Sequence, residues 1–186
     1  MAHNVSRDAT AIEIREKTAK KHKNKNENQK KRRVRPKKGD EQPKALSKVE
    51  QQLKMTQEQK LNSLPSFYDK GCKKNSQGNK DYWIGYKLHI DTIDGDIPVF
   101  TVLTPASVHD SPASTPLEEM TSQRVNSLYS LMDAAYDSAA IKSQIRDKGK
   151  VPVVDHNPRR DEKIKMPPPE KERYKARSSS EHVNSY

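Results

Sequence analysis

The chain has 186 residues, of which 31% are hydrophobic and 33% are charged, and its formal net charge is +11. This length suits one domain, no run of about 18 apolar residues is present to span a bilayer, and the N-terminus lacks the apolar segment of a secretory signal. A single cysteine, Cys72, excludes an internal disulfide. We expect a soluble intracellular protein. Its clustered positive charge favours nucleic acid as the partner, with solubility alone as the simpler interpretation.

The N-terminal part divides into three segments of different composition. Residues 4–14 (NVSRDATAIEI) are short and fairly apolar, and a strand could open at Val5. Residues 15–44 hold one large apolar side chain, Val34. They cannot bury enough surface to offset the entropy of ordering, which predicts a mobile basic loop. Residues 46–64 place leucine and valine at roughly helical spacing, which predicts one or two short helices.

A compact part is expected to begin near Tyr82. Residues 83–91 (WIGYKLHID) alternate in side-chain character with period two, as a strand does. The DGD sequence at 94–96 is typical of a turn, and residues 98–104 (PVFTVLT) are rich in β-forming side chains. Together these features predict a β-hairpin.

Two further elements follow the hairpin. The sequence TPLEEM predicts a helix with Thr115 as N-cap, Pro116 at the first helical position and Glu118 at the third. Residues 128–133 (LYSLMD) then predict a buried strand that ends in Asp133.

The C-terminal third continues the alternation of helix and strand. A helix is expected from Ser138 to Gly149, a strand over residues 151–155, and a helical pattern from Glu170 onward, after a proline-rich connector. This order of elements favours an α/β or α+β sheet with helices packed against it.

Three carboxylates occupy distinctive places in this order. Asp8 lies on or just after the first strand, Asp133 closes the fourth, and Glu181 lies on the final helix. An unpaired buried carboxylate is costly, and Mg²⁺ or Mn²⁺, which prefer oxygen ligands, would remove that cost. The simpler interpretation is that these are three of 25 acidic residues, most of them on solvated faces.

Tyr174, Arg177 and Glu181 form the pattern Y-x2-R-x3-E near the end of the chain. Residues at positions i, i+3 and i+7 share one face of a helix. A hydroxyl, a guanidinium and a carboxylate on one face suit a phosphate and a metal held side by side. An ordinary polar helix face is the alternative.

Six motifs in this order carry a family resemblance: SRDATAIE, GYKLHID with DGDIP, LTPASVHDS, LMDAAYD, NPRR and Y-x2-R-x3-E-x2-NS. The chain resembles the DDE transposases of bacterial insertion sequences, and more narrowly the group whose signature reads Tyr-x2-Arg-x3-Glu-x6-Lys. The resemblance covers essentially the whole chain.

The resemblance implies an α/β fold, an RNase H-like mixed sheet flanked by helices, with a long basic and partly disordered insertion after the first strand. The domain boundaries expected from it are residues 1–14 for the first strand, 15–81 for the basic insertion with its short helices, and 82–186 for the remainder of the catalytic core.

The resemblance also implies chemistry. Asp8, Asp133 and Glu181 would coordinate two Mg²⁺ (or Mn²⁺) ions, and Tyr174 and Arg177 would position DNA phosphates. The reaction would be nicking at the ends of the element followed by strand transfer to target DNA, without a covalent protein–DNA intermediate. The expected setting is the bacterial cytoplasm in association with the nucleoid, as a homodimer or in a mixed complex with full-length transposase, and without a membrane.

Other candidates stay open. Asp91 is an alternative for the first carboxylate, whereas Asp137 is expected to be a turn or cap residue. His89 and His109 are expected to be structural, because a single cysteine and no paired spacing argue against zinc.

Basic residues outside the signature are candidates for DNA-backbone contacts. Arg159 and Arg160 either contact phosphate or belong to a solvated loop. The segment 15–44 is expected to bind DNA independently of sequence, with a steep salt dependence; a merely soluble insertion or a nuclear localisation signal are the alternatives. Its densest cluster comprises Lys31, Arg32, Arg33 and Arg35.

The sequence departs from the signature at both ends. The expected lysine would fall at position 188, and Met1 precedes Asp8 by only seven residues, which leaves no room for an N-terminal DNA-binding domain. We therefore expect a partial transposase that is weakly active or inactive alone. The alternatives are a metal-dependent nuclease of the RNase H-like class and a non-catalytic DNA-binding fragment.

Overall fold

The computed structural model describes residues 2–15, 46–74, 77–158 and 162–184. The mobile basic loop expected over residues 15–44 lies almost entirely outside these ranges. The elements in chain order are β1 (Ala2–Glu13), α1 (Lys48–Leu53), α2 (Gln57–Asn62), β2 (Asp69–Lys74), β3 (Lys80–Ile93), β4 (Ile97–Pro105), α3 (Asp110–Arg124), β5 (Ser127–Met132), the 3₁₀ helix η2 (Ala134–Tyr136), α4 (Ala139–Asp147), β6 (Val151–Val154), α5 (Pro168–Tyr174), the 3₁₀ helix η3 (Lys175–Arg177) and α6 (Ser178–Asn184).

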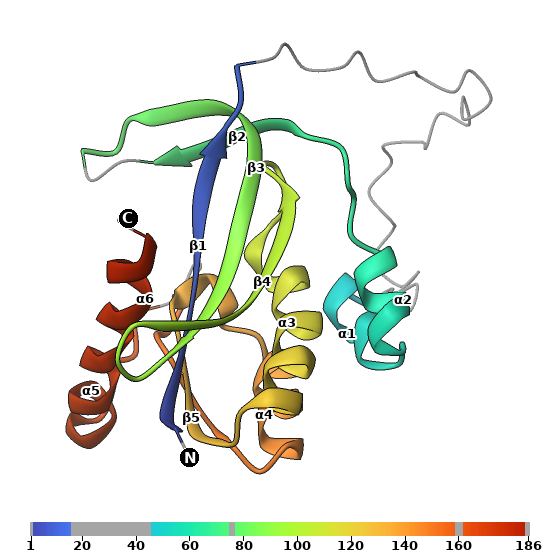
Figure 1. Ribbon diagram of the computed structural model, residues 1–186. Helices are drawn as coiled ribbons and strands as arrows, with labels where there is room; N and C mark the ends of the chain where they lie inside the picture. The colour runs from blue at the N-terminus through green and yellow to red at the C-terminus, as the bar shows by residue number, and fades with distance from the viewer. Residues whose placement is uncertain (1, 16–45, 75–76, 159–161, 185–186) are drawn as a thin grey trace, which may run out of the picture.

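Six strands of the described chain form one mixed sheet in the order β2-β3-β1-β5-β6, with β4 also paired to β3. β3 runs antiparallel to β1, β2 and β4, whereas β5 is parallel to β1 and to β6. Helices α3 and α4 cover one face, with α1 and α2 packed on α3, and α5 and α6 lie on the other (Figure 1). The α/β class and the mixed sheet flanked by helices are thereby confirmed.

Two apolar clusters hold the helices to the sheet. One gathers Val49, Met132, Tyr136, Ile141 and Ile145 between α1, α4 and the end of β5. The other joins four side chains from the turn after α2, from β4 and from α3, namely Leu64, Val102, Leu117 and Met120. Because Val49 and Leu64 belong to these clusters, the described residues 46–64 pack against the core of the sheet and its helices.

One or two short helices were expected within residues 46–64; two are present, and each begins with a capping box. In α1, Glu50 N–H donates to Ser47 Oγ, and Ser47 N–H donates to the Glu50 carboxylate at 2.7 Å. Thr56 and Gln59 make the same reciprocal pair in α2. Such pairs satisfy amides that a helix start leaves without partners.

The hairpin expected from residues 83–104 is confirmed as β3 and β4, and its turn uses Gly95 at φ 84°. Strand β2 was not predicted, because its sequence DKGCKK has none of the apolar alternation that marks a strand. It pairs along β3 from Gly85 to Lys80.

The expected start of a helix at Thr115 is wrong. Helix α3 begins at Asp110 with His109 as N-cap, so Pro116 lies inside it. Thr115 is buried and donates to Gln52 Oε1 of α1 at 2.9 Å. Residues 113–118 of α3 are buried against the sheet and α1, and this tertiary packing overrides the local Thr-Pro-x-Glu capping signal.

The later elements agree with expectation. Strands β5 and β6 fall where residues 128–133 and 151–155 predicted them, and α4 follows Ser138 and ends before Gly149 at φ 74°. The C-terminal helical segment is interrupted by η3. No helix in the described parts of the chain has the length and apolar character needed to cross a membrane.

Candidate active site on the α6 face of the sheet

Asp8 lies in the middle of β1, opposite Ile90 of β3. Its neighbour Ser6, two residues earlier and so on the same strand face, donates to Ala176 O of η3 at 3.2 Å. Asp8 accepts a hydrogen bond from Asn184 Nδ2 at 2.9 Å. Strand alternation therefore turns Asp8 towards the C-terminal helices.

Asp133 follows the last residue of β5 and caps η2, where its Oδ1 accepts from Ala135 N–H at 2.9 Å. In the parallel pairing, Arg7 stands beside Met132, so Asp8 within β1 and Asp133 just after β5 lie at the same level. Burial raises the pKa of Asp133. The Ala135 amide opposes this rise, the carboxylates of Asp110 and Asp8 add to it, and Arg177 lowers it. Asp133 thus lies within electrostatic reach of Asp8.

Arg177 connects the remaining signature residues. Its Nη1 lies 3.7 Å from Asp8 Oδ1, and its Nη2 donates to the Glu181 carboxylate. Its guanidinium also lies 5.6 Å from the centre of the Tyr174 ring. The expectation of one continuous helical face is only approximate, because α5 ends at Tyr174 and η3 separates it from α6.

Burial raises the pKa of Tyr174 to about 12, against the lowering effect of Arg177 and with the carboxylates of Asp155, Asp133 and Glu181 adding to the rise. The phenol therefore keeps its proton at neutral pH and can donate a hydrogen bond. Two serine contacts hold this segment against the sheet: Ser6 to Ala176, and Ser179 Oγ to Ile93 O of β3 at 3.3 Å.

The donor chemistry of this cluster fits a hard divalent cation in part. Asp8 and Asp133 offer carboxylate oxygens, which Mg²⁺ and Mn²⁺ prefer, and a cation would offset the burial and the neighbouring negative charges that raise the pKa of Asp133. Glu181 is instead ion-paired with Arg177 and its side chain is 54% exposed. Among the described residues, no three His, Cys, Asp or Glu side chains converge closely enough to hold a metal ion.

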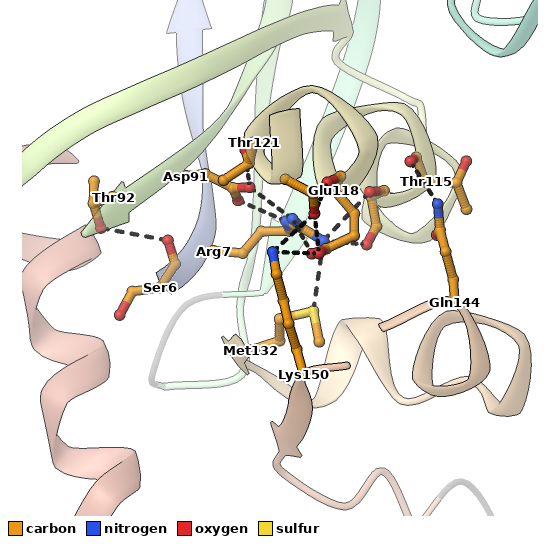
Figure 2. A network of polar contacts seen from close by, with 12 residues as sticks. Ser6, Arg7, Asp91, Thr92, Thr115, Glu118, Thr121, Met132, Gln144 and Lys150 are labelled. Carbon is orange, nitrogen blue, oxygen red and sulfur yellow. Dashed lines mark hydrogen bonds and ion pairs between the residues drawn. The ribbon is translucent and has the colours of Figure 1, made fainter. Parts of the chain in front are cut away.

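Asp91, the alternative for the first carboxylate, belongs to a different environment. It lies on the α3 face of the sheet and is fully buried (Figure 2). Arg7 donates to its two oxygens at 2.6 Å each, and Thr121 Oγ1 donates to it at 2.6 Å. Both oxygens of Asp91 therefore accept hydrogen bonds within the core, on the face of the sheet opposite Asp8.

The same buried network extends through Glu118, which accepts from Arg7 at 3.0 Å and from Lys150 at 2.9 Å. Burial alone would raise the pKa of Glu118, but the charges of Arg7 and Lys150 outweigh it and lower that pKa. Two cations and two carboxylates thus balance inside the protein, where an unpaired charge would be costly.

The remaining polar candidates have structural partners. Asp137 closes η2 and accepts from Lys142 Nζ at 2.5 Å, in line with its expected cap role. His89 is buried beside Thr104 Oγ1 at 2.9 Å, and His109 caps α3. Arg159 and Arg160, together with the basic cluster of Lys31, Arg32, Arg33 and Arg35, lie outside the described residues.

Asp110 and Asn184 were not singled out in the sequence. Asp110 is the first residue of α3, pairs with Lys87 Nζ at 2.9 Å, and contributes to the raised pKa of Asp133. Its motif, LTPASVHDS, contributed to the family resemblance without marking this residue. Asn184 lies far along the chain from Asp8, and no local pattern connects the two.

Comparison with known proteins gives one family. A family model described as a transposase DDE domain matches residues 5–185. No curated protein and no solved structure matched the chain.

Proposed function

Because the chain belongs to the DDE transposase family, we propose that it cuts and joins DNA strands, with Asp8, Asp133 and Glu181 as its catalytic carboxylates. The observation that supports this most directly is the arrangement of Asp8 and Asp133 on adjacent parallel strands, with Arg177 reaching across from η3 to Asp8 and Glu181. DNA, as element ends and as target, is the proposed partner in the bacterial cytoplasm.

The reaction proposed for this site is phosphoryl transfer in two steps. First, a water oxygen bonds to the phosphorus of the scissile phosphodiester, the bond to the 3′ oxygen breaks, and that oxygen takes up a proton to leave a 3′-hydroxyl. Second, this 3′-hydroxyl loses its proton as its oxygen bonds to a phosphorus of the target strand, and the 3′ oxygen displaced there takes up a proton to become the new 3′-hydroxyl. The first step consumes one water molecule and leaves a 5′-phosphate, and the second exchanges one phosphodiester bond for another, so neither step needs an oxidant or reductant.

The side chains around the carboxylates have defined tasks in this proposal. Asp8, Asp133 and Glu181 would hold two Mg²⁺ or Mn²⁺ ions, which when bound stabilise charge on the transferring phosphoryl group and lower the pKa of water. Arg177 would exchange its ion pair with Glu181 for a DNA phosphate, which a guanidinium can grip through two donors. Tyr174, protonated at neutral pH, would donate to a second phosphate oxygen.

Nicking of a supercoiled plasmid in Mg²⁺ or Mn²⁺ tests the proposal. We expect Asp8→Asn, Asp133→Asn and Glu181→Gln each to lower the nicking rate by at least roughly 100-fold, since even outer contacts of a metal site are worth 10–100-fold. Asp147→Asn, on the exposed end of α4, is the matched control and should keep full activity. Equal rates in the wild type and the three variants would refute the assignment.

Two further readouts separate the alternatives. A labelled oligonucleotide with a free 3′-hydroxyl becomes joined to the plasmid only if strand transfer occurs; nicking without joining indicates a nuclease. Thermal unfolding with and without Mn²⁺ reports binding independently of activity, because a ligand at 100 times its Kd stabilises the folded state by about 2.7 kcal/mol. No shift and no nicking, with DNA binding intact, would indicate a non-catalytic DNA-binding protein.

A further inference from the structure

Strand β2 and the start of β3 form a two-stranded ribbon that extends beyond the rest of the sheet. β1 pairs with β3 only from Gly85 onward, whereas Lys80 to Ile84 of β3 pair with β2 in the described chain. Figure 1 shows this ribbon, in green, projecting at the top of the molecule towards the side on which α6 lies. The ribbon is thus free of the helices that cover the sheet.

The two faces of the ribbon differ in chemistry. The register places Cys72 opposite Tyr82 and Lys74 opposite Lys80, and alternation adds Lys70 to the same face. We call this set of five side chains the ribbon face; all five residues are exposed. Among the described ribbon residues, the carboxylates of Asp69 and Asp81 belong to the other face. The ribbon face therefore carries three positive charges and no negative one.

An aromatic ring lies within this basic face. Tyr82 is 55% exposed, and Lys70 Nζ lies 4.3 Å from the centre of its ring. Lysine and tyrosine side chains are both among the groups that donate hydrogen bonds to the phosphates and sugars of duplex DNA.

The opposite face anchors the ribbon. The Trp83 indole covers Gly71 so closely that a Cβ at Gly71 would lie 2.5 Å from the Trp83 ring and 2.8 Å from Ala106 Cβ. At the base of the ribbon, Ser107 N–H donates to Asp69 Oδ1 at 2.8 Å. These contacts fix the ribbon to the loop after β4 and leave the ribbon face directed away from the packed side.

The ribbon face is continuous with the face of the sheet that holds the candidate active site. Tyr82 and Ile90 are separated by an even number of residues on β3, and Ile90 stands directly opposite Asp8, so both belong to one face of the strand by alternation. At about 3.3 Å per residue, eight residues span at most about 26 Å. The distance along β3 from Tyr82 to Ile90, beside Asp8, therefore equals about eight base pairs of duplex at 3.4 Å each.

We propose that the ribbon face binds the backbone of duplex DNA whose scissile strand lies at the carboxylates, with Lys70, Lys74 and Lys80 contacting phosphates. A two-stranded ribbon is narrow enough to enter a major groove, and the excess of positive charge complements the polyanion. The proposal rests on the proposed function for the choice of DNA, and it adds a contact surface outside the signature residues.

Salt-dependent binding of a labelled duplex tests the proposal. The variant Lys70→Gln/Lys74→Gln/Lys80→Gln is compared with Lys48→Gln/Lys54→Gln/Lys148→Gln, which removes the same charge from three other exposed lysines. Each lost phosphate contact should make the negative slope of log K against log salt shallower by about 0.9. At 0.1 M salt, this difference in slope corresponds to binding that is about eightfold weaker for each lost contact. Equal losses in the two variants would overturn the proposal, because net charge alone would then explain them.

Cys72, the chain's single cysteine, provides a second readout in the unmodified protein, since it is exposed on the ribbon face. Saturating duplex should slow its alkylation by a maleimide, and an unchanged rate would overturn the proposal. Greater protection by single-stranded RNA of equal length would assign the face to RNA and also overturn it.

These measurements are independent of nicking. A chain that fails to nick but shows Cys72 protection and the reduced slope supports the ribbon face and refutes the catalytic proposal. A chain that nicks DNA but leaves Cys72 unprotected supports the catalytic proposal and refutes the role of the ribbon face.

Discussion

Replacing Arg7 with methionine tests how much of the fold depends on the buried charge network. Arg7 is fully buried and makes three hydrogen bonds to carboxylates, two to Asp91 at 2.6 Å and one to Glu118 at 3.0 Å. The variant leaves Asp91 buried with only Thr121 as a partner, and leaves Glu118 with Lys150 and Ser122. Removing one member of a buried pair costs about 3–5 kcal/mol, because the other charge stays uncompensated.

That cost is a large part of the stability of a domain, which is about 5–15 kcal/mol in total. For a chain of this size it corresponds to a fall in Tm of about 6–20 °C. Urea unfolding followed by circular dichroism at pH 7 gives the free energy directly. Arg146→Met, at an exposed position on α4, is the matched control and should change stability by about 0.5 kcal/mol or less.

The double variant Arg7→Met/Asp91→Asn separates charge from packing. Because it removes the uncompensated carboxylate as well, it should be more stable than Arg7→Met alone. If Arg7→Met costs less than about 1 kcal/mol, or if the double variant is no better than the single one, the network does not carry the energy assigned to it.

Three further predictions concern titration and the site. Burial lowers the pKa of His89 to about 4 from an ordinary 6.5, so the stability that neutral His89 contributes is complete above pH 6.5 and is lost as the pH falls towards 4. In the wild type this loss should amount to about 3 kcal/mol of unfolding free energy, and His89→Gln should remove that pH dependence, as measured by urea unfolding at each pH. Burial raises the pKa of Asp133, so ionised Asp133 destabilises the folded state as the pH rises above 3.8. Asp133→Asn can keep the cap to Ala135 and should therefore raise Tm at pH 7, although it removes a proposed metal ligand and should abolish nicking. A lower Tm would contradict the sign of this prediction. Arg177→Gln removes partly exposed ion pairs to Asp8 and Glu181 and should change stability by at most about 1 kcal/mol, yet it should lower nicking by roughly 10-fold or more; retained nicking would refute a phosphate-positioning role.

Most of the sheet could be predicted because its strands carry local signals. The alternation in β3, the turn at Gly95 and the apolar runs of β5 and β6 each announce their element within a few residues. β2 escaped because its stability comes from pairing with β3 and from Trp83 over Gly71, which are long-range contacts. The start of α3 was misplaced for a related reason: burial of Thr115 and Glu118 against distant partners outweighs the local capping pattern.

The candidate site divides in the same way. The places of Asp8, Asp133 and Glu181 in the order of elements could be derived from the sequence and the family motifs. Their partners could not, since the contacts of Arg177 with Asp8 and of Asn184 with Asp8 join opposite ends of the chain. The burial of Arg7 and Glu118 could not be predicted either, because hydrophobic periodicity assigns charged residues to the protein surface even when they form a buried ion pair.

The packing of the C-terminal helices on the first strand has a consequence for synthesis. The pairing that sets Asp8 beside Asp133 involves only β1 and β5. Glu181 and Arg177 leave the ribosome much later, and they reach Asp8 only when η3 and α6 settle on β1. A nascent chain that lacks α6 therefore has an incomplete set of carboxylates, and the proposed strand-cutting activity requires η3 and α6 to have been synthesised and packed on β1.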